Sequence, residues 1–405
     1  MAIKTIIDGA LLAECEITGN VRFGMHRVAE EITGHLVNND QLDISFANTV
    51  YSARYHRLLK LYLKKNYPGY TDKMVSKFPA LNPEIPFVNS ITDKVSRELS
   101  FKPGIKGLDQ NDLFFSFYYP FPKNVQHASI KKCITYLDII ALRMSGYNSK
   151  LINLTRKIVE SIVPNYAISI SEFSKQDLCN YDKRVDPKKV FVVPLAASSE
   201  LFFVNKDEGK WKIIKEKYHL PDQYFLCISS TDHRKNLPHI IKSFGKLAMQ
   251  QNIGDLHLVM TGNMVLNSNI FDELNIDKKI RDKIVLARSI ANEDLSIVYS
   301  NAMCFFFMSK YEGFGLPALE AMQCGIPVVT SNSSSLPEVV GNAGIMLPPS
   351  DEDALCEVMY KMYESESLRK KYSAMGLQRA NEFSWQRCAN EYVEIFKKIA
   401  LKPAR

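Results

Sequence analysis

Short apolar runs alternate with amphipathic stretches along most of this chain. The second half contains six continuous apolar runs of strand length: YFLCISS (224–230), HLVMTG (257–262), KIVLAR (283–288), MCFFFMS (303–309), IPVVTS (326–331) and GIMLPP (344–349). Segments with a helical period, such as LPHIIKSFGKLAMQQ, lie between them. This alternation predicts a parallel sheet, and strands without a polar face predict that helices cover both sides of it.

The first half shows the same alternation less clearly. KTIIDGALLA predicts a strand that ends in a turn, and after a polar loop FGMHRVAEEITGHL predicts an amphipathic helix. LDISFAN and four later runs predict further strands: LFFSFYY (113–119), CITYLDI (133–139), YAISIS (166–171) and VFVVPLA (190–196). Between them, a basic stretch that ends near residue 110 has no clear pattern and contains several prolines.

These patterns predict an α/β protein with two doubly wound, Rossmann-like domains that face each other across a cleft. The first domain spans 1–200, and a polar, basic linker leads to the second domain at 207–383. A helix within 384–405 is expected to cross back and brace the first domain. The length of 405 residues suits two domains.

Composition places the chain among soluble globular proteins, with 46% apolar and 23% charged residues. No signal peptide is expected, since MAIKTIIDGALLAECE carries acidic residues where an apolar core is needed. No apolar run approaches the roughly 18–20 residues of a membrane span. The eight cysteines are scattered without a CxxC pair, which indicates reduced thiols and a cytoplasmic location.

Part of the net charge of +7 lies in residues 51–78, where seven basic residues accompany one acid among Tyr, Leu and Phe side chains. Such a segment can lie on an anionic bilayer, which would add peripheral contact with the inner face of the cell membrane. A solvated helix face followed by a loop explains the pattern equally well. Nucleic acid is not expected as a partner, because the basic excess is modest and no stacking motif accompanies it.

The stretch SKYEGFGLPALEAMQCGIPVVTS (309–331) carries the strongest chemical pattern. Glu312 and Glu320 stand eight positions apart, with two glycines between them. The pattern predicts a buried strand, a glycine loop and a helix from about Leu316. Free backbone N–H groups at such a corner suit a phosphate, and Glu320, one turn into the helix, can reach hydroxyl groups beside it.

Three other loops should lie at the same edge of the second sheet. TDHRKN (231–236) precedes a helix, and its cations Arg234 and Lys235 suit a diphosphate. An isolated Arg-Lys pair is, however, more often a solvated surface feature. Arg288 follows another predicted strand, and SNSSSLPE (331–338) ends at Glu338, which by itself is explained as an acid near a helix start.

Together these residues resemble the retaining glycosyltransferases of the GT-B architecture, in the family often called family 4, which includes bacterial mannosyl- and rhamnosyltransferases. The resemblance spans nearly the whole chain. Its most specific part is the Glu-x7-Glu motif EGFGLPALE, followed by AMQCGIPVVTSNSSSLPEV. Weaker similarities are HRKNL (233–237), ISISEFSKQDL (168–178), VFVVPLAASSELF (190–202) and TGNVRFGMHR (18–27).

The resemblance implies roles for the residues of the second domain. Glu320 would hold the ribose hydroxyls of a sugar nucleotide, and Glu312 would face the donor sugar and the reaction centre. Arg234 and Lys235 would neutralise the diphosphate as the glycosidic bond breaks. Backbone N–H groups of the glycine loop would bind the sugar hydroxyls and the distal phosphate: Gly313, Phe314, Gly315 and Leu316.

The resemblance also implies two weaker contacts and the absence of a cofactor. Arg288 lies where the family often contacts the base, and Gly19 would let the first-domain loop approach the donor phosphates closely. The family generally works without a divalent metal, and no DxD-type metal motif stands at a comparable strand end. The two cations would take the part of the metal.

The chain departs from the family at the end of the strand ITYLDII. Where the family usually has His-Asp, this chain has Leu137-Asp138, and Asp138 is retained as a catalytic candidate. In relatives that histidine approaches the 6-hydroxyl of the donor sugar. Leu137 cannot donate a hydrogen bond but would pack against a methyl group, which leads to the hypothesis of a 6-deoxyhexose donor such as rhamnose or fucose. The alternative is that Leu137 is an ordinary core residue.

The resemblance predicts a retaining, metal-independent hexosyltransferase that uses a nucleoside-diphosphate sugar. Its acceptor would be a glycan or a polyprenyl-linked oligosaccharide in bacterial surface polysaccharide synthesis. Two alternatives stay open. One is a non-catalytic, nucleotide-sugar-binding partner subunit, which the missing histidine supports. The other is a nucleotide-sugar epimerase with the same architecture.

Overall fold

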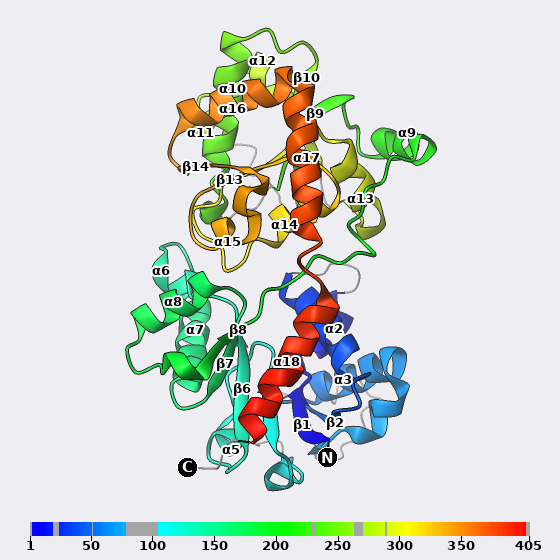
Figure 1. Ribbon diagram of the computed structural model, residues 1–405, viewed down its shortest axis with the longest axis vertical. Helices are drawn as coiled ribbons and strands as arrows, with labels where there is room; N and C mark the ends of the chain where they lie inside the picture. Colours follow the sequence, from blue (N-terminus) through cyan, green and yellow to red (C-terminus); the bar gives the residue numbers. More distant parts are fainter. Residues whose placement is uncertain are drawn as a thin grey trace. The chain divides into compact units, whose positions relative to one another are not determined.

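The computed structural model describes residues 2–18, 24–50, 52–77, 104–228, 232–262, 270–287 and 290–401. The chain forms two compact units, Met1–Pro194 together with Trp385–Arg405, and Leu195–Ser384 (Figure 1). The division lies a few residues before the predicted linker. The last helix, α18 (Trp385–Ala400), belongs to the first unit.

In its described residues, the first unit is built on a six-stranded parallel sheet in the order β2-β1-β5-β6-β7-β8. After β2 joins one side of β1, β5 joins the other side, so the strand order reverses between β1 and β5. The strands are β1 (Ile3–Asp8), β2 (Leu42–Ala47), β5 (Leu113–Ser116), β6 (Lys131–Tyr136), β7 (Tyr166–Ser169) and β8 (Val190–Val192). A small antiparallel pair, β3 (Ser76–Lys77) and β4 (Gly104–Ile105), forms a separate two-stranded sheet. A bridge between Phe46 and Met74 links the segment just before β3 to β2.

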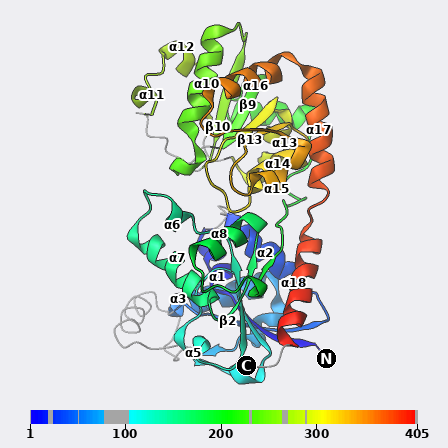
Figure 2. The same cartoon turned by 60° about the vertical axis from the view of Figure 1, so that its left-hand side comes forward.

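Helices cover both faces of the first sheet. On one face, Ile6, Phe114 and Ile134 share a buried core with residues of α7. The other face is covered by α18, drawn in red in Figure 2. There the ring of Phe115 packs against Tyr392 and Phe396 of α18, with ring centroids 5.8 and 5.0 Å apart. The helices are α1 (Ala10–Thr18), α2 (Gly24–Leu36), α3 (Ala53–Asn66), α5 (Lys123–Gln126), α6 (Ile140–Arg143), α7 (Ser149–Ile162), α8 (Glu172–Tyr181) and α18.

The second unit repeats the plan, with the described strands in the order β11-β10-β9-β12-β13-β14, all parallel. The order reverses between β9 and β12. The strands are β9 (Gln223–Ile228), β10 (Leu256–Thr261), β11 (Ile284–Ala287), β12 (Cys304–Phe307), β13 (Val328–Ser331) and β14 (Ile345–Leu347). Each lies within, or one residue from, the apolar run that predicts it, and the prediction of two doubly wound, Rossmann-like domains is confirmed.

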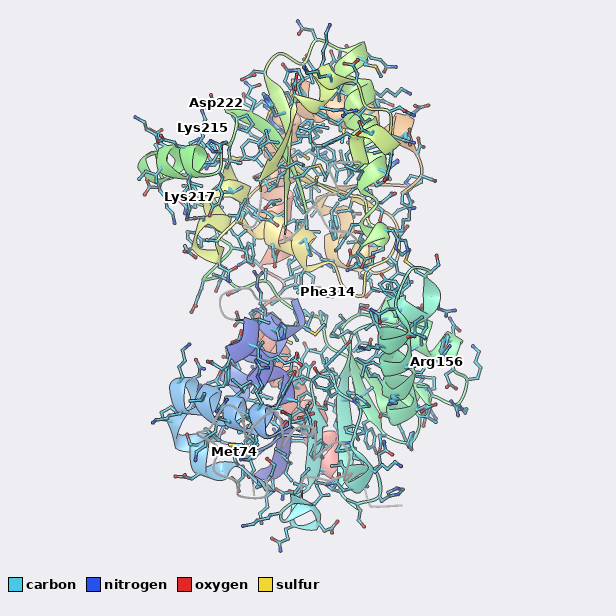
Figure 3. The ribbon with its side chains drawn as sticks, turned by 180° about the vertical axis from the view of Figure 1, so that it is seen from behind. Met74, Arg156, Lys215, Lys217, Asp222 and Phe314 are labelled. Atoms are coloured by element: carbon cyan, nitrogen blue, oxygen red, sulfur yellow. The ribbon has the colours of Figure 1, made fainter. Side chains whose placement is uncertain are left out.

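Helices also cover both faces of the second sheet. Phe225 and Phe306 on one face share a core with residues of α10 and α16, whereas Phe305 on the other meets Tyr299 of α13. The helices are α9 (Glu208–Lys217), α10 (Leu237–Gln250), α11 (Ile270–Glu273), α12 (Lys278–Arg281), α13 (Asn292–Asn301), α14 (Leu316–Gln323), α15 (Leu336–Val340), α16 (Glu352–Glu364) and α17 (Glu366–Ala380). Two ion pairs connect α9 to the rest of the unit: Lys215 pairs with Asp222, and Lys217 pairs with Asp294 of α13. Lys215, Lys217 and Asp222 are labelled in Figure 3.

One local prediction is wrong. Residues 10–18, predicted as a turn and a polar loop, form α1, with Ala10, Leu11, Leu12 and Cys15 buried. A helix that is apolar around most of its circumference lacks the periodic signature of an amphipathic one. In the poorly patterned stretch, residues 53–66 form α3.

Each of the eight cysteines is free, and seven of them are buried. Across the described ranges, no helix combines the length and apolar character needed to cross a membrane.

Candidate functional site

The candidate site lies at the carboxyl edge of the second sheet, where the strand order reverses. In open α/β sheets the loops that follow the two strands flanking such a reversal diverge and leave room for a ligand. After β9, the short 3-10 helix η4 (His233–Lys235) presents Arg234 and Lys235. After β12, the loop that leads into α14 presents Glu312. Residues from two separate predicted motifs therefore meet at one corner.

Glu312 forms ion pairs with both cations. Its Oε1 lies 2.6 Å from Nζ of Lys235, and its Oε2 lies 2.5 Å from an Nη of Arg234. The three side chains are largely buried, with exposed fractions of 8% for Glu312, 10% for Lys235 and 18% for Arg234. Asp232 adds a second carboxylate, since its Oδ2 lies 2.8 Å from Nε of Arg234, so the two positive charges of this corner face two negative ones.

The charges of the cluster determine the protonation state of its carboxyl group. Burial alone would raise the pKa of Glu312, but the positive charges of Lys235 and Arg234 outweigh this effect and hold its pKa below the usual value. Glu312 is therefore ionised at neutral pH. The Lys235 ammonium also lies 4.5 Å from the centre of the Phe307 ring, a cation–π contact that supports the buried charge.

Short polar side chains hold the two loops in place. Asp232 caps η4 and its Oδ2 accepts a 2.8 Å hydrogen bond from Nε of Arg234. The side-chain amide of Asn236 donates to the carbonyl oxygens of Met308 and Pro349, at 3.1 and 2.6 Å. These contacts fix the cations relative to the end of β12. Sequence reasoning did not single out Asp232 or Asn236, since neither shows its partner in the local sequence.

The SNSSS loop supports the glutamate loop. The Ser334 hydroxyl accepts a 2.9 Å hydrogen bond from the backbone N–H of Glu312. The Ser335 hydroxyl lies 2.9 Å from the carbonyl oxygen of Glu312 and 2.8 Å from that of Phe314, and can donate to either. The small residues after β13, noted in the sequence without an assigned role, therefore set the path of the loop.

Gly315, the N-cap residue immediately before α14, has a conformation that favours glycine, with φ at +111°. A Cβ atom there would lie 2.6 Å from a methyl carbon of Leu336. The helix begins at Leu316, as predicted, and carries Glu320, which is 8% exposed. Phe314, labelled in Figure 3, packs edge-on against Phe383 at 6.0 Å and anchors the loop to its own unit.

The remaining predicted site residues lie elsewhere or outside the described residues. Gly19 and Arg288 belong to ranges that the structure does not describe. Leu137 and Asp138 follow β6 in the first unit, and both are partly exposed. Asp138 Oδ1 accepts a 3.0 Å hydrogen bond from the backbone N–H of Ile140, at the start of α6. The roles assigned to these four residues stay predictions.

Comparison with known proteins identifies the family. Residues 210–379 match the family model described as "Glycosyl transferases group 1". The chain is 30% identical over 290 residues to O-antigen chain mannosyltransferase B of Escherichia coli, and the match covers 70% of this chain and 72% of the relative. The chain belongs to the group 1 glycosyltransferases. The family predicted from the Glu-x7-Glu segment and its neighbours is thereby confirmed.

Solved structures agree on the fold. A glycosyltransferase from Rickettsia africae has a TM-score of 0.66 to this chain at 15% identity, and the match covers 99% of this chain and 100% of the other. Anabaena HepE, solved in complex with UDP, has a TM-score of 0.66 at 12% identity, with coverage of 98% and 100%. The GT-B fold class is confirmed by these likenesses.

Proposed function

We propose that this glycosyltransferase transfers a hexose from a nucleoside-diphosphate sugar to a glycan acceptor, with retention of the anomeric configuration, in bacterial surface polysaccharide synthesis. One observation carries the proposal: Arg234, Lys235 and Glu312 meet at the strand reversal of the second sheet. The name of the E. coli relative supports the acceptor class, and the UDP complex of HepE supports a nucleotide donor.

In the proposed reaction, the bond between the sugar C1 and the diphosphate oxygen breaks and a bond from C1 to the acceptor oxygen forms. The acceptor hydroxyl gives its proton to the departing phosphate. Arg234 and Lys235 stabilise the negative charge that develops on this phosphate, and their fixed positions require little reorganisation during the reaction. Glu312 faces the sugar, and Glu320 holds the ribose hydroxyls. No divalent metal takes part.

The proposal is tested by incubating the protein with nucleoside-diphosphate hexoses, with and without glycan acceptors, in the presence of EDTA. Release of nucleoside diphosphate that depends on the acceptor, with an unchanged rate in EDTA, is expected. Lys235→Met should abolish release and Lys361→Met, a lysine of α16 paired with Glu357, should not. Binding of the sugar nucleotide without acceptor-dependent release would favour the non-catalytic partner subunit. Conversion of the donor to its epimer would favour the epimerase.

The identity of the transferred sugar depends on Leu137. A leucine at this strand end supports a donor with a methyl group at C6, whereas the name of the relative supports mannose. Rates with mannose, rhamnose and fucose donors, compared in the unmodified protein and in Leu137→His, separate the two. If the unmodified protein prefers 6-deoxy donors and Leu137→His loses this preference, the result supports a donor with a methyl group at C6. A clear preference of the unmodified protein for mannose rejects it.

We propose in addition that α3 contacts an anionic membrane. Leu59, Tyr62 and Leu63 are buried, whereas the solvent-exposed side carries Arg54, Lys60, Leu61, Lys64 and Lys65. Each basic residue near an anionic surface contributes about 1 kcal/mol. The protein should therefore bind phosphatidylglycerol vesicles at low salt and leave them at high salt. Replacing Lys60, Lys64 and Lys65 by glutamine should abolish binding. Lack of binding by the unmodified protein would reject the contact.

A further inference from the structure

A second polar cluster lies in the first unit, at the carboxyl edge of its sheet. The strand order reverses there between β1 and β5. The segment after β1 carries Glu14 on α1, and the segment after β5 carries Tyr118 and Tyr119. Tyr55 comes from α3, which follows β2. The cluster thus occupies the position in the first sheet that the Glu312 cluster occupies in the second, where doubly wound sheets bind ligands.

Glu14 is the hub of this cluster. Its Oε1 accepts a 2.9 Å hydrogen bond from the Tyr55 hydroxyl and a second, short one from the Tyr119 hydroxyl. Its Oε2 lies 3.3 Å from Nε2 of His26 on α2. The Tyr118 ring stands edge-on to that of Tyr119, with centroids 5.5 Å apart. The Glu14 side chain is 19% exposed and the three tyrosines are partly exposed, so a solute can reach the group.

The protonation states decide what the cluster offers to a ligand. Burial would raise the pKa of Glu14, but hydrogen bonds from His26, Tyr119 and Tyr55 outweigh it and lower the pKa. Burial and the Glu14 charge raise the pKa of Tyr55 to about 12 and that of Tyr119 further. The carboxylate is therefore ionised and the phenols keep their protons, which they donate to Glu14.

Phenols oriented in this way have lone pairs but no proton left for a ligand. Together with the remaining lone pairs of the carboxylate, they form a surface of hydrogen-bond acceptors with a negative charge at its centre. Such a surface suits a ligand rich in hydroxyl donors and repels phosphate or carboxylate groups. The adjacent Tyr118 ring adds an apolar face, as expected where the C–H side of a sugar ring is covered.

We propose that Glu14, Tyr55 and Tyr119 form the acceptor subsite and select a neutral sugar residue there over an anionic one. The proposal rests on the proposed function, because it takes the bound sugar to be the acceptor of transfer. The sugar hydroxyls donate to the two phenol oxygens and to Glu14. His26 and Glu14 also join α1 to α2, so that the carboxylate is held in position whether or not a ligand is bound.

Sugar binding is measured directly, without turnover, by saturation-transfer NMR with methyl α-D-mannopyranoside and mannose 6-phosphate as probes. The unmodified protein should bind the neutral sugar at least tenfold more tightly. Tyr55→Phe and Tyr119→Phe should each weaken that binding about 3- to 10-fold. Tyr70→Phe is the matched control, because the Tyr70 hydroxyl donates to the backbone carbonyl of Val37 in the same unit. Equal binding of the two probes, or equal effects of the three Tyr→Phe changes, would overturn the proposal.

Glu14→Gln tests the selection by charge. It should reduce the preference for the neutral probe at least fivefold, since it removes the negative charge and keeps the shape. A purely structural role would weaken both probes equally, and that result also overturns the proposal. Thermal melts of each variant identify a loss of folding, and the Tyr55 and Tyr119 variants test the same site independently.

Transfer assays separate the failure of this proposal from failure of the proposed function. In the Tyr variants the KM for the acceptor should rise while the Kd for nucleoside diphosphate stays unchanged. If no donor supports transfer but the neutral probe still binds with the expected variant pattern, the proposed function fails and the neutral-sugar site stands. If transfer proceeds and Tyr119→Phe leaves the acceptor KM unchanged, the subsite is rejected.

Discussion

In the proposed reaction the donor diphosphate binds Arg234 and Lys235, the two cations that pair with Glu312, and this leads to a prediction about Glu312→Gln. The carboxylate now satisfies both cations at 2.5 and 2.6 Å. A diphosphate that binds the same cations brings further negative charge close to this carboxylate. Glutamine keeps the shape of the side chain and removes the charge. We therefore expect Glu312→Gln to bind nucleoside diphosphate more tightly than the unmodified protein, while turnover falls because the proposed contact with the sugar is weakened.

The size of the expected gain in nucleoside-diphosphate affinity follows from the geometry. A phosphate oxygen hydrogen-bonded on the far side of either cation would lie about 5 Å from the Glu312 oxygens, given hydrogen bonds of about 2.6–2.9 Å. Two unit charges at that distance repel by about 3 kcal/mol at an effective dielectric constant of 20. Because a diphosphate shares its charge among several oxygens and solvent screens part of it, we expect about 1–2 kcal/mol. This corresponds to a Kd about 5- to 30-fold lower.

The same change should lower the stability of the second unit. Removing one partner of a buried ion pair leaves uncompensated charge, here on Lys235, at a cost of about 3 kcal/mol, whereas Arg234 keeps its ion pair with Asp232. Bound nucleoside diphosphate replaces the lost negative charge. The rise in Tm on saturation with nucleotide should therefore be larger for Glu312→Gln than for the unmodified protein.

Titration calorimetry with GDP, UDP and dTDP measures the affinity, and nucleotide release with saturating donor and acceptor measures the turnover. Glu364→Gln is the control, since it makes the same charge change at the end of α16, away from the cluster. A Kd for Glu312→Gln equal to or higher than that of the unmodified protein would refute competition between the carboxylate and the phosphate. Unchanged turnover would refute a role with the donor sugar.

Three further changes test other parts of the structure. If the Glu320 carboxylate binds ribose, Glu320→Gln should raise the donor KM about 10-fold and leave kcat at saturating donor nearly unchanged. A fall in kcat as large as the rise in KM would contradict the division of roles between the two glutamates. Gly315→Ala should lower the free energy of unfolding by about 1–3 kcal/mol in urea titrations, because Gly315 has a positive φ and an added Cβ would clash with a methyl of Leu336. Gly245→Ala, the control, should not lower it, because Gly245 lies inside α10 and an added Cβ there would be 3.5 Å from the nearest side-chain atom. Burial raises the pKa of Asp8 to about 6, so the folded state binds more protons than the unfolded state between about pH 4 and 6. The free energy of unfolding should therefore fall by about 3 kcal/mol as the pH rises through that range. Asp8→Asn should remove this fall, and an identical pH profile in the variant would show that Asp8 is not its source.

The strands and the charged corner of the second unit could be predicted because their signals are local. Runs such as YFLCISS and MCFFFMS are apolar without interruption, as both faces of the sheet are covered by helices. Once the strands are placed, the residues at their carboxyl ends are known to share an edge. This is enough to predict that Arg234, Lys235 and Glu312 lie at one corner.

What could not be predicted depends on tertiary contacts. The hydrogen bonds of Asn236 to Met308 and Pro349 join three loops, and no spacing in the sequence indicates them. The ion pairs of Glu312 with the two cations likewise have no local signal, because they join residues of separate loops. In the first unit, Glu14 lies in a helix that has no amphipathic pattern, so neither α1 nor the tyrosines gathered around it could be recognised from periodicity.

The packing of α18 has a consequence for the order of folding during synthesis. The second unit is one continuous segment, Leu195–Ser384, whereas the first is assembled from residues before and after it. Tyr392 bonds to Thr135 through its hydroxyl at 3.0 Å and, with Phe396, covers the ring of Phe115. The second unit can therefore complete its core before α18 is synthesised, at a time when the first sheet still exposes Phe115. A nascent chain should need protection of this face by chaperones until the last helix leaves the ribosome.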